Sequence, residues 1–273
     1  MGQFNLNNDK ILVCYLITKF DNQETLENFI INYKKFNSGV DHDLLICFKQ
    51  LNNLVIKRYH SLLKPIKYIN FEDNYGSNDY DFGSYKRVAE KFSTKIIFFL
   101  NSHSYPVCNY WLKMISDYFH KNSLIATTAS FESQLSSIRY KKFYKIINYF
   151  FKKYKFKKKF NSYPNPHLRT TGLLINAKDY LSFMKDKVVN SKHDAWELES
   201  GKIGLTNYFK FLGYNLYVVN SDGNKFEEKF WKFSETYNYL NQEKSIISDK
   251  HTRKYLSLGE KERKTLQIRT WGV

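Results

Sequence analysis

Cysteine, long apolar runs and acidic side chains are all scarce in this chain of 273 residues. The three cysteines, Cys14, Cys47 and Cys108, form neither a CxxC pair nor a zinc-ligand spacing, which predicts reduced thiols in a cytosolic compartment. No apolar run approaches the roughly 20 residues that a membrane-spanning helix needs. The first apolar run, 11–17, follows asparagine-rich rather than basic residues, unlike a signal peptide. We therefore expect a cytoplasmic protein.

The shortage of acidic residues leaves a large excess of positive charge. The chain has 43 Lys+Arg against 26 Asp+Glu, so its formal net charge is +17. A nucleotide, a nucleic acid or an acidic membrane surface would complement this charge. The alternative is the compositional bias of an AT-rich genome, because Lys, Asn, Phe, Tyr and Ile are abundant together. A hydrophobic content of 42% predicts a real core and argues against global disorder.

Strand-like and helix-like segments alternate along the chain, which predicts an α/β fold with a mainly parallel sheet flanked by helices. The expected strands are 11–17, 43–48, 66–71, 95–100, 124–130, 168–176 and 216–220. The expected helices are 24–36, 53–63, 84–92, 110–119 and 204–212. We expect a single domain over 1–273, with an insertion at 139–160 and a helical, lid-like tail at 221–273.

The insertion at 139–160 is basic and aromatic, and its pattern predicts an amphipathic helix. One interpretation is a helix lying on an anionic membrane surface, on the inner face of the membrane. The alternative is a helix packed on the domain through its aromatic face, with its lysines in water. The crowded charges of 153–159 also favour a mobile tether. The expected apolar stripe consists of Tyr140, Phe143, Tyr144, Ile147, Phe150, Phe151 and Tyr154.

The segment 79–106 carries the strongest functional signal. An acidic turn at 79–84 precedes a helix, and the buried strand 95–100 then stops at the polar cluster 101–104. Open α/β sheets present ligand-binding groups at the carboxyl ends of their strands. The alternative is structural, since Asp81 or Ser84 can cap the helix and the polar cluster can simply end a strand.

These motifs resemble those of nucleotide-sugar glycosyltransferases of the GT-A type, most closely the bacterial rhamnan-synthesis type. That family carries Tyr-Asp-Phe leading to Trp-Lys, and a strand that ends in Asn-Asp-Ser before a proline. The matching residues here are Tyr80-Asp81-Phe82, Tyr85-Lys86 and Asn101-Ser102-His103-Ser104 before Pro106. The resemblance covers about 11–119 well and 167–220 more loosely, and the insertion at 139–160 has no counterpart in it.

The resemblance implies a hexosyl- or deoxyhexosyltransferase that uses a UDP-, GDP- or dTDP-sugar and a glycan or lipid-linked acceptor, as in polysaccharide biosynthesis. It implies a GT-A (Rossmann-like) sheet and, at strand 95–100, an Asp-x-Asp pair that holds Mn or Mg on the diphosphate. Asn101 and His103 stand there instead, so metal binding is open, and His103 would either ligate manganese or hydrogen-bond the diphosphate. The implied donor-binding residues are Asp79, Asp81, Gly83, Ser84, Lys86, Asn101, Ser102, His103, Arg169, His251 and Arg253.

Two later segments complete the site that the resemblance implies. In 194–201, before the helix 204–212, Glu199 is the first choice for the base of an inverting reaction and Glu197 the second. Trp196, Thr170 and Thr171 are the acceptor-binding candidates. The alternatives are a charge at the N-terminus of a helix for Glu199 and a surface ion pair for Arg169. For 249–255 the alternative is a surface helix capped by Asp249 or Thr252.

Three functions remain open from the sequence. Sugar transfer leads, because polar clusters recur at the ends of several distant strands. A degenerate GT-A protein that binds without turnover is the second, since the acidic pair is missing. A protein that binds nucleic acid or an anionic membrane through its basic surface is the third, and nucleic acid is the less favoured partner because the basic aromatic segment is local.

Overall fold

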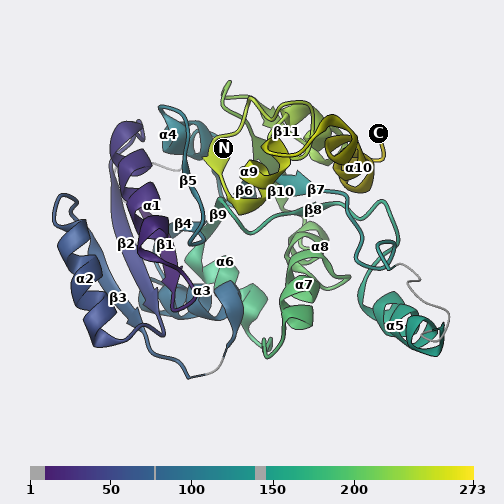
Figure 1. The fold of residues 1–273 in the computed structure, drawn as a ribbon, viewed down its shortest axis with the longest axis horizontal. Coiled ribbons are helices and arrows are strands. Elements are labelled where there is room, and N and C mark those ends of the chain that lie inside the picture. The colour runs from purple at the N-terminus through teal and green to yellow at the C-terminus, as the bar shows by residue number, and fades with distance from the viewer. Residues whose placement is uncertain (1–9, 77, 139–145) are drawn as a thin grey trace.

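The computed structural model describes residues 10–76, 78–138 and 146–273, and an eight-stranded sheet lies at its centre (Figure 1). The strand order is β11-β10-β6-β9-β4-β1-β2-β3, and neighbours are parallel except where β9 and β11 pair. The strands are β1 (Ile11–Thr18), β2 (His42–Lys49), β3 (Ile69–Asp73), β4 (Ile96–Leu100), β6 (Ser123–Ala126), β9 (Leu173–Asn176), β10 (Asn215–Val219) and β11 (Lys225–Phe226). The expected mainly parallel α/β sheet is therefore confirmed.

Helices cover both faces of the sheet, because alternate side chains of the central strands are apolar and point to opposite sides. Leu12, Cys14 and Leu16 of β1 pack against one helical layer, and Val13 and Tyr15 pack against the other. The first layer contains α3 (Tyr80–Lys91), α6 (Ala177–Met184), α7 (Lys192–Ser200) and α8 (Leu205–Phe211). The second contains α1 (Gln23–Lys35), α2 (Asn53–Leu63) and α4 (Trp111–Ser116).

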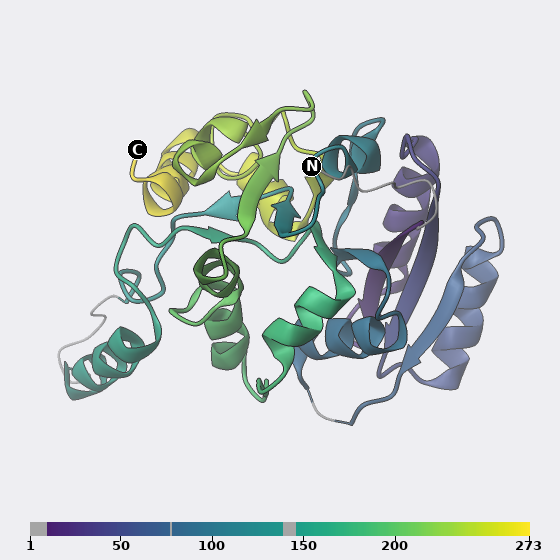
Figure 2. The same cartoon turned by 180° about the vertical axis from the view of Figure 1, so that it is seen from behind.

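The C-terminal segment folds back over the carboxyl ends of the strands (Figures 1 and 2). Its short strand β12 (Ile247–Ser248) pairs with β5 (Tyr105–Pro106), which follows the polar cluster after β4. It also contains the 3₁₀ helix η2 (Glu228–Ser234) and the helices α9 (Lys250–Leu256) and α10 (Glu260–Trp271). The tail thus combines helices with short strands, and Asp249 caps α9 with Thr252 in a capping box.

Two predicted strands are interrupted in the structure. The segment 124–130 divides into β6 and β7 (Ala129–Ser130), and 168–176 divides into β8 (His167–Leu168) and β9. β7 and β8 form a separate antiparallel ribbon. The break between β6 and β7 lies at 127–128. The break between β8 and β9 ends at Gly172, whose φ of 72° is outside the extended region. A side chain at this position would also collide with Thr127, so the backbones approach closely here.

Three local expectations are wrong. α3 begins at Tyr80 rather than at 84, so Asp81, Gly83 and Ser84 lie inside its first turns and not in a preceding turn. The sequence 194–201 precedes α8 as expected, but it forms most of α7, a helix that was not predicted. Strand β3 is shifted to Ile69–Asp73 because its register is fixed by pairing with β2.

The helix α5 (Ile146–Lys159) extends from the rest of the molecule (Figures 1 and 2). It includes 153–159, so the expected tether is helical instead. The expected packing through the aromatic stripe is also wrong for the described part, since Ile147, Phe150, Phe151 and Tyr154 are exposed. Tyr140, Phe143 and Tyr144 lie outside the described residues. Across 10–76, 78–138 and 146–273, no helix is both long and apolar enough to cross a membrane.

Candidate functional site

Asp21 and His103 meet where β1 and β4 end side by side. His103 Nε2 lies 3.1 Å from Asp21 Oδ1, which also accepts a hydrogen bond of 2.9 Å from the Ser102 hydroxyl. Asp21 Oδ2 accepts from the amide and hydroxyl of Thr18 at 2.8 and 2.7 Å. Burial would raise the pKa of Asp21, but hydrogen bonds from His103, Thr18 and Ser102 hold it below the usual range. Asp21 was not predicted as a site residue from the sequence. The pattern that could have identified it is a carboxylate soon after the buried strand β1.

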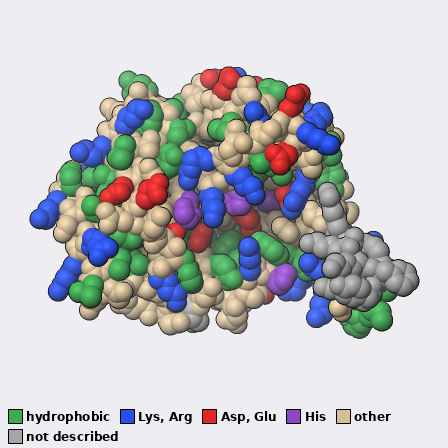
Figure 3. Space-filling model, in the orientation of Figure 1, with side chains coloured by type: hydrophobic (Ala, Val, Ile, Leu, Met, Phe, Trp, Pro, Cys, Tyr) green, Lys and Arg blue, Asp and Glu red, His purple; other side chains and the backbone are tan. Residues whose placement is uncertain are grey.

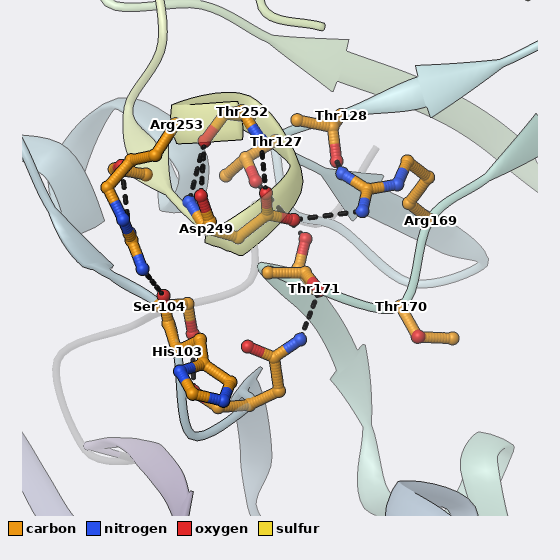
Figure 4. Close-up of polar contacts among 12 residues, drawn as sticks. His103, Ser104, Thr127, Thr128, Arg169, Thr170, Thr171, Asp249, Thr252 and Arg253 are labelled. Atoms are coloured by element: carbon orange, nitrogen blue, oxygen red, sulfur yellow. Dashed lines mark hydrogen bonds and ion pairs between the residues drawn. The ribbon is translucent and has the colours of Figure 1, made fainter. Parts of the chain in front are cut away.

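The loop after β4 is fixed by the tail. Arg253 Nη2 donates to the carbonyl of His103 at 2.9 Å, and its Nη1 donates to Ser248 Oγ at 3.1 Å (Figure 4). The Arg253 guanidinium also lies over the ring of Tyr105, 4.7 Å from its centroid. Arg253 and His103 are therefore adjacent, although 150 residues separate them. The charge of Arg253 therefore lies at this edge of the sheet, and its contact with a donor stays a prediction.

Asn101 contacts the turn before β9. Its Nδ2 donates to Thr171 Oγ1 at 2.7 Å, so two predicted site residues from distant segments are joined. Its Oδ1 is buried and has no hydrogen-bond partner among the described residues. A buried amide oxygen without a partner is costly and is a candidate acceptor for a ligand hydroxyl or amide.

Arg169 carries a buried ion pair rather than the surface ion pair considered from the sequence. Its Nη2 lies 2.9 Å from Asp249 Oδ2, and its guanidinium stacks over Tyr237 at 4.0 Å (Figure 4). Both charged side chains are almost fully buried. Burial favours the neutral form of Asp249, but Arg169 and the Thr252 amide hold its pKa below the usual range. Arg169 thus connects the turn after β8 to the start of α9.

Glu199 lies in the last turn of α7 and faces the same turn. Its Oε1 accepts from the amide and hydroxyl of Thr170 at 3.2 and 3.3 Å. Glu197, the second choice for a base, instead forms an ion pair with Lys159 of α5. The two carboxylates therefore have different partners, Thr170 for Glu199 and Lys159 for Glu197, in the described structure.

A cavity of about 640 Å³ adjoins Glu199, and predicted residues from three segments line it together: Arg169, Trp196, Glu199 and His251. The buried His167 is a further lining residue that the sequence did not single out. Burial lowers the pKa of both His167 and His251, and the Glu199 carboxylate partly opposes the shift. The cavity thus combines a carboxylate, neutral imidazoles and an aromatic ring, which suits a polar organic ligand.

Asp81, on α3, interacts electrostatically with Glu199 and Asp21. Burial raises its pKa to about 6, Lys49 opposes the shift, and the charges of Glu199 and Asp21 add to it. Asp81, Asp21, His103 and Glu199 are therefore electrostatically coupled, although they come from four segments. In Figure 3, acidic, basic and histidine side chains gather in a central hollow of the surface.

Asp79, Gly83 and Ser84 hold α3 in place. Asp79 pairs with the buried Lys49 and with Arg87, whose Nη1 lies 2.6 Å from Asp79 Oδ2. Ser84 Oγ donates to Asp73 at 2.6 Å, and Gly83 lies against the Asp79 carboxylate. Asp79 and Ser84 thus have partners within the protein, and the donor contacts expected for all three residues stay a prediction. Lys86 lines a separate cavity of about 270 Å³ on this side.

The residues at the end of β4 do not fit a divalent ion held by the protein. The described residues bring no three His, Cys, Asp or Glu side chains into positions that could share a metal. His103 Nε2 already faces Asp21, and the amide nitrogen of Asn101 faces Thr171. Asn101 Oδ1 and the remaining ring nitrogen of His103 are a weak donor set for the hard, oxygen-seeking cations Mg²⁺ and Mn²⁺.

Comparison with known proteins finds structural neighbours but no relative by sequence. No protein-family model matches the chain, and no curated protein matches its sequence. Similar solved structures include the mannosyltransferase Ktr4p from S. cerevisiae (TM-score 0.37, 10% identity, 71% of this chain and 60% of Ktr4p) and Ktr4p in complex with GDP (TM-score 0.42, 10% identity, 98% and 86%). Another is the bifunctional glycosyltransferase WbbM (TM-score 0.42, 10% identity, 69% and 37%). This chain therefore aligns with less than two thirds of the first Ktr4p structure and of WbbM, and TM-scores below 0.5 support no assignment of function.

Proposed function

We propose that this protein is a GT-A-type glycosyltransferase. It would transfer a hexosyl or deoxyhexosyl group from a UDP-, GDP- or dTDP-sugar to a glycan or lipid-linked acceptor, with inversion, in cytoplasmic polysaccharide biosynthesis. One observation carries the proposal: Asp21 and His103 meet at the carboxyl ends of β1 and β4, and their charges and that of Glu199, which lines a cavity of about 640 Å³, all act on Asp81. Nucleotide ligands bind at this edge of open α/β sheets.

The donor half of the proposed site is the end of β4. A sugar transferase must stabilise the nucleoside diphosphate as it leaves with additional negative charge. His103, oriented by Asp21, has a ring nitrogen available to face the diphosphate, and Arg253 supplies a fixed positive charge beside it. Asn101 Oδ1 is available to accept a hydrogen bond from the donor. This arrangement needs no metal-dependent step.

The acceptor half of the proposed site is the cavity next to Glu199. Thr170 orients the Glu199 carboxylate through Oε1, and Trp196 offers an aromatic surface on which a sugar ring can stack. Glu199 takes the proton of the acceptor hydroxyl. The acceptor oxygen bonds to the anomeric carbon of the donor sugar as it loses this proton. The bond from that carbon to the diphosphate oxygen breaks at the same time, and the nucleoside diphosphate leaves with the bonding electrons. General-base catalysis of this kind contributes about 10²–10⁴-fold.

The base is tested by comparing Glu199→Gln with Glu197→Gln. After a thermal-shift screen identifies a stabilising nucleotide sugar, we expect Glu199→Gln to bind it normally but to slow its hydrolysis or transfer by about 100-fold or more. Glu197→Gln is the matched control, because Glu197 lies on the same helix but pairs with Lys159 of α5.

Equal activity of the wild type and Glu199→Gln would contradict the assigned base. Donor binding without any turnover would favour the degenerate transferase. Tight DNA binding at physiological salt with no response to nucleotide sugars would favour the nucleic-acid alternative.

A further inference from the structure

The helix α5 has two opposite faces with different surroundings. At 3.6 residues per turn, positions 147, 150, 151 and 154 fall within about 100° of arc, and position 156 falls on the opposite side. Phe156 is buried, whereas Ile147, Phe150, Phe151 and Tyr154 are 60–69% exposed. The helix is thus attached through one face and presents an apolar stripe of four large side chains on the other.

Positive charge surrounds this stripe. α5 contains six lysines and no acidic residue: Lys152, Lys153, Lys155, Lys157, Lys158 and Lys159. By helical position, Lys153 and Lys157 border the stripe on one side and Lys155 on the other. The Lys158 ammonium lies 4.5 Å from the ring centroid of Tyr154, at the end of the stripe. Aromatic and aliphatic side chains flanked by lysines are the composition of a helix that lies in the interface of an anionic bilayer.

We propose that α5 docks this protein on an anionic lipid surface, with Ile147, Phe150, Phe151 and Tyr154 inserted between headgroups. Charge complementarity selects this partner. Pairing of two copies through the stripe would bring two sets of six lysines together without any acidic counter-charge on either helix. A bilayer both covers the apolar stripe and neutralises the lysines.

The docking surface is connected to the proposed acceptor cavity through α7. Phe156 packs edge-on against His193 at 5.5 Å, and His193 packs against Trp196 at 5.1 Å. Trp196 in turn lines the cavity with Glu199. If the proposed transferase function holds, on which this step rests, docking holds the whole protein, with its cavity on the attached side of α5, at the membrane and favours a lipid-linked acceptor over a soluble glycan.

Vesicle co-sedimentation of the full chain tests the proposal without donor or turnover, so its result is independent of the enzymatic assay. We expect the protein to bind phosphatidylcholine vesicles that contain phosphatidylserine and to bind pure phosphatidylcholine at least about tenfold more weakly. Phe150→Ser/Phe151→Ser should weaken binding to the anionic vesicles about tenfold or more. The matched control is Phe211→Ser on α8, whose side chain is 90% exposed, and it should bind as the wild type does.

Two double variants with the same change in net charge distinguish the effect of the α5 lysines from the effect of the total charge of the protein. Lys153→Glu/Lys157→Glu on α5 should weaken binding to anionic vesicles more than Lys34→Glu/Lys35→Glu on α1, although both change the net charge equally. Phe151→Trp should show a blue-shifted fluorescence increment when anionic vesicles are added. Unchanged melting temperatures establish that the variants fold.

Three results would overturn the proposal. The first is no binding of the wild type to anionic vesicles. The second is equal loss of binding in the α5 variants and their controls. The third is a stripe-dependent dimer, or stripe-dependent binding to an oligonucleotide, in protein that ignores vesicles.

Discussion

Arg169 holds its charge in a buried ion pair. Its ion pair with Asp249 is almost completely shielded from water, and Tyr237 covers the guanidinium. Removing one member of a buried pair leaves the other charge without compensation, which costs far more than the pair itself contributes. Arg169 is therefore placed to hold the tail on the sheet edge as well as to line the cavity.

We predict that Arg169→Met lowers the free energy of unfolding by about 3–5 kcal/mol. Adding Asp249→Asn should restore part of this loss, because asparagine keeps the N-cap of α9 but removes the unpaired carboxylate. Urea denaturation of both variants measures the effect. Additive losses in the double variant would contradict the role of the ion pair.

The ionised carboxylate of Asp81, in contrast to the ion pair of Arg169, lowers the free energy of unfolding. Burial raises its pKa from 3.8 to about 6 in the folded protein, so the ionised form is less favourable in the folded than in the unfolded state. The associated stability is complete below the unfolded pKa and is lost as the pH rises through the folded value.

We therefore predict that Asp81→Asn raises the free energy of unfolding by about 2–3 kcal/mol at pH 7.5. The gain should shrink between pH 6 and the ordinary value near 3.8, and should vanish below it. Denaturant unfolding across this pH range measures it. A gain that is the same at every pH would point to packing instead of titration.

At the scale of the element, the first turns of α3 depend on a contact that only glycine permits. A Cβ at Gly83 would overlap the carboxylate of Asp79, which pairs with Lys49 and Arg87. Nothing lies within 4 Å of a Cβ at Gly76. Position 83 is thus restricted by the buried ion network and not by backbone conformation.

Gly83→Ala should lower the free energy of unfolding by about 1–3 kcal/mol, despite the higher helix propensity of alanine, because Asp79 must move. Gly76→Ala, the matched control, should change it by less than about 0.5 kcal/mol. Thermal unfolding of the two variants gives the comparison. Equal stability would mean that the Asp79 network adjusts without cost.

At the scale of the whole molecule, the tail joins the sheet edge into one charged site. β12 pairs with β5, Arg253 binds the His103 carbonyl, and Arg169 binds Asp249. These contacts place the Arg253 guanidinium at the end of β4, where the described residues lack a shared metal-ligand group.

We predict that a nucleoside diphosphate at about 100 times its dissociation constant stabilises the protein by about 2.7 kcal/mol, equally in EDTA and in manganese. His103→Ala should weaken this effect, and higher salt should weaken it further because the contacts are ionic. Thermal shift with UDP, GDP and dTDP measures all three. Stabilisation that requires manganese would contradict side-chain recognition of the diphosphate.

The amino-acid sequence by itself determined the elements whose signals are local. Strands β1, β2 and β4 follow from short apolar runs, and α2 occupies its expected 53–63 because Asn52 caps it and apolar residues follow at helical spacing. Gly172 shows where local signals fail. The segment 168–176 was predicted as one strand, but it is divided before β9, where Gly172 lies against Thr127.

Only the tertiary structure decided which side chains meet. Asp21 contacts His103 because β1 and β4 are neighbours in the sheet, and Arg169 contacts Asp249 because the tail returns over that edge. The register of α7 directs Glu199 to Thr170 and Glu197 to Lys159. These contacts depend on strand order and on packing between distant segments, which cannot be predicted from the spacing of neighbouring residues. Helices and strands can be predicted because their apolar periodicity involves consecutive residues.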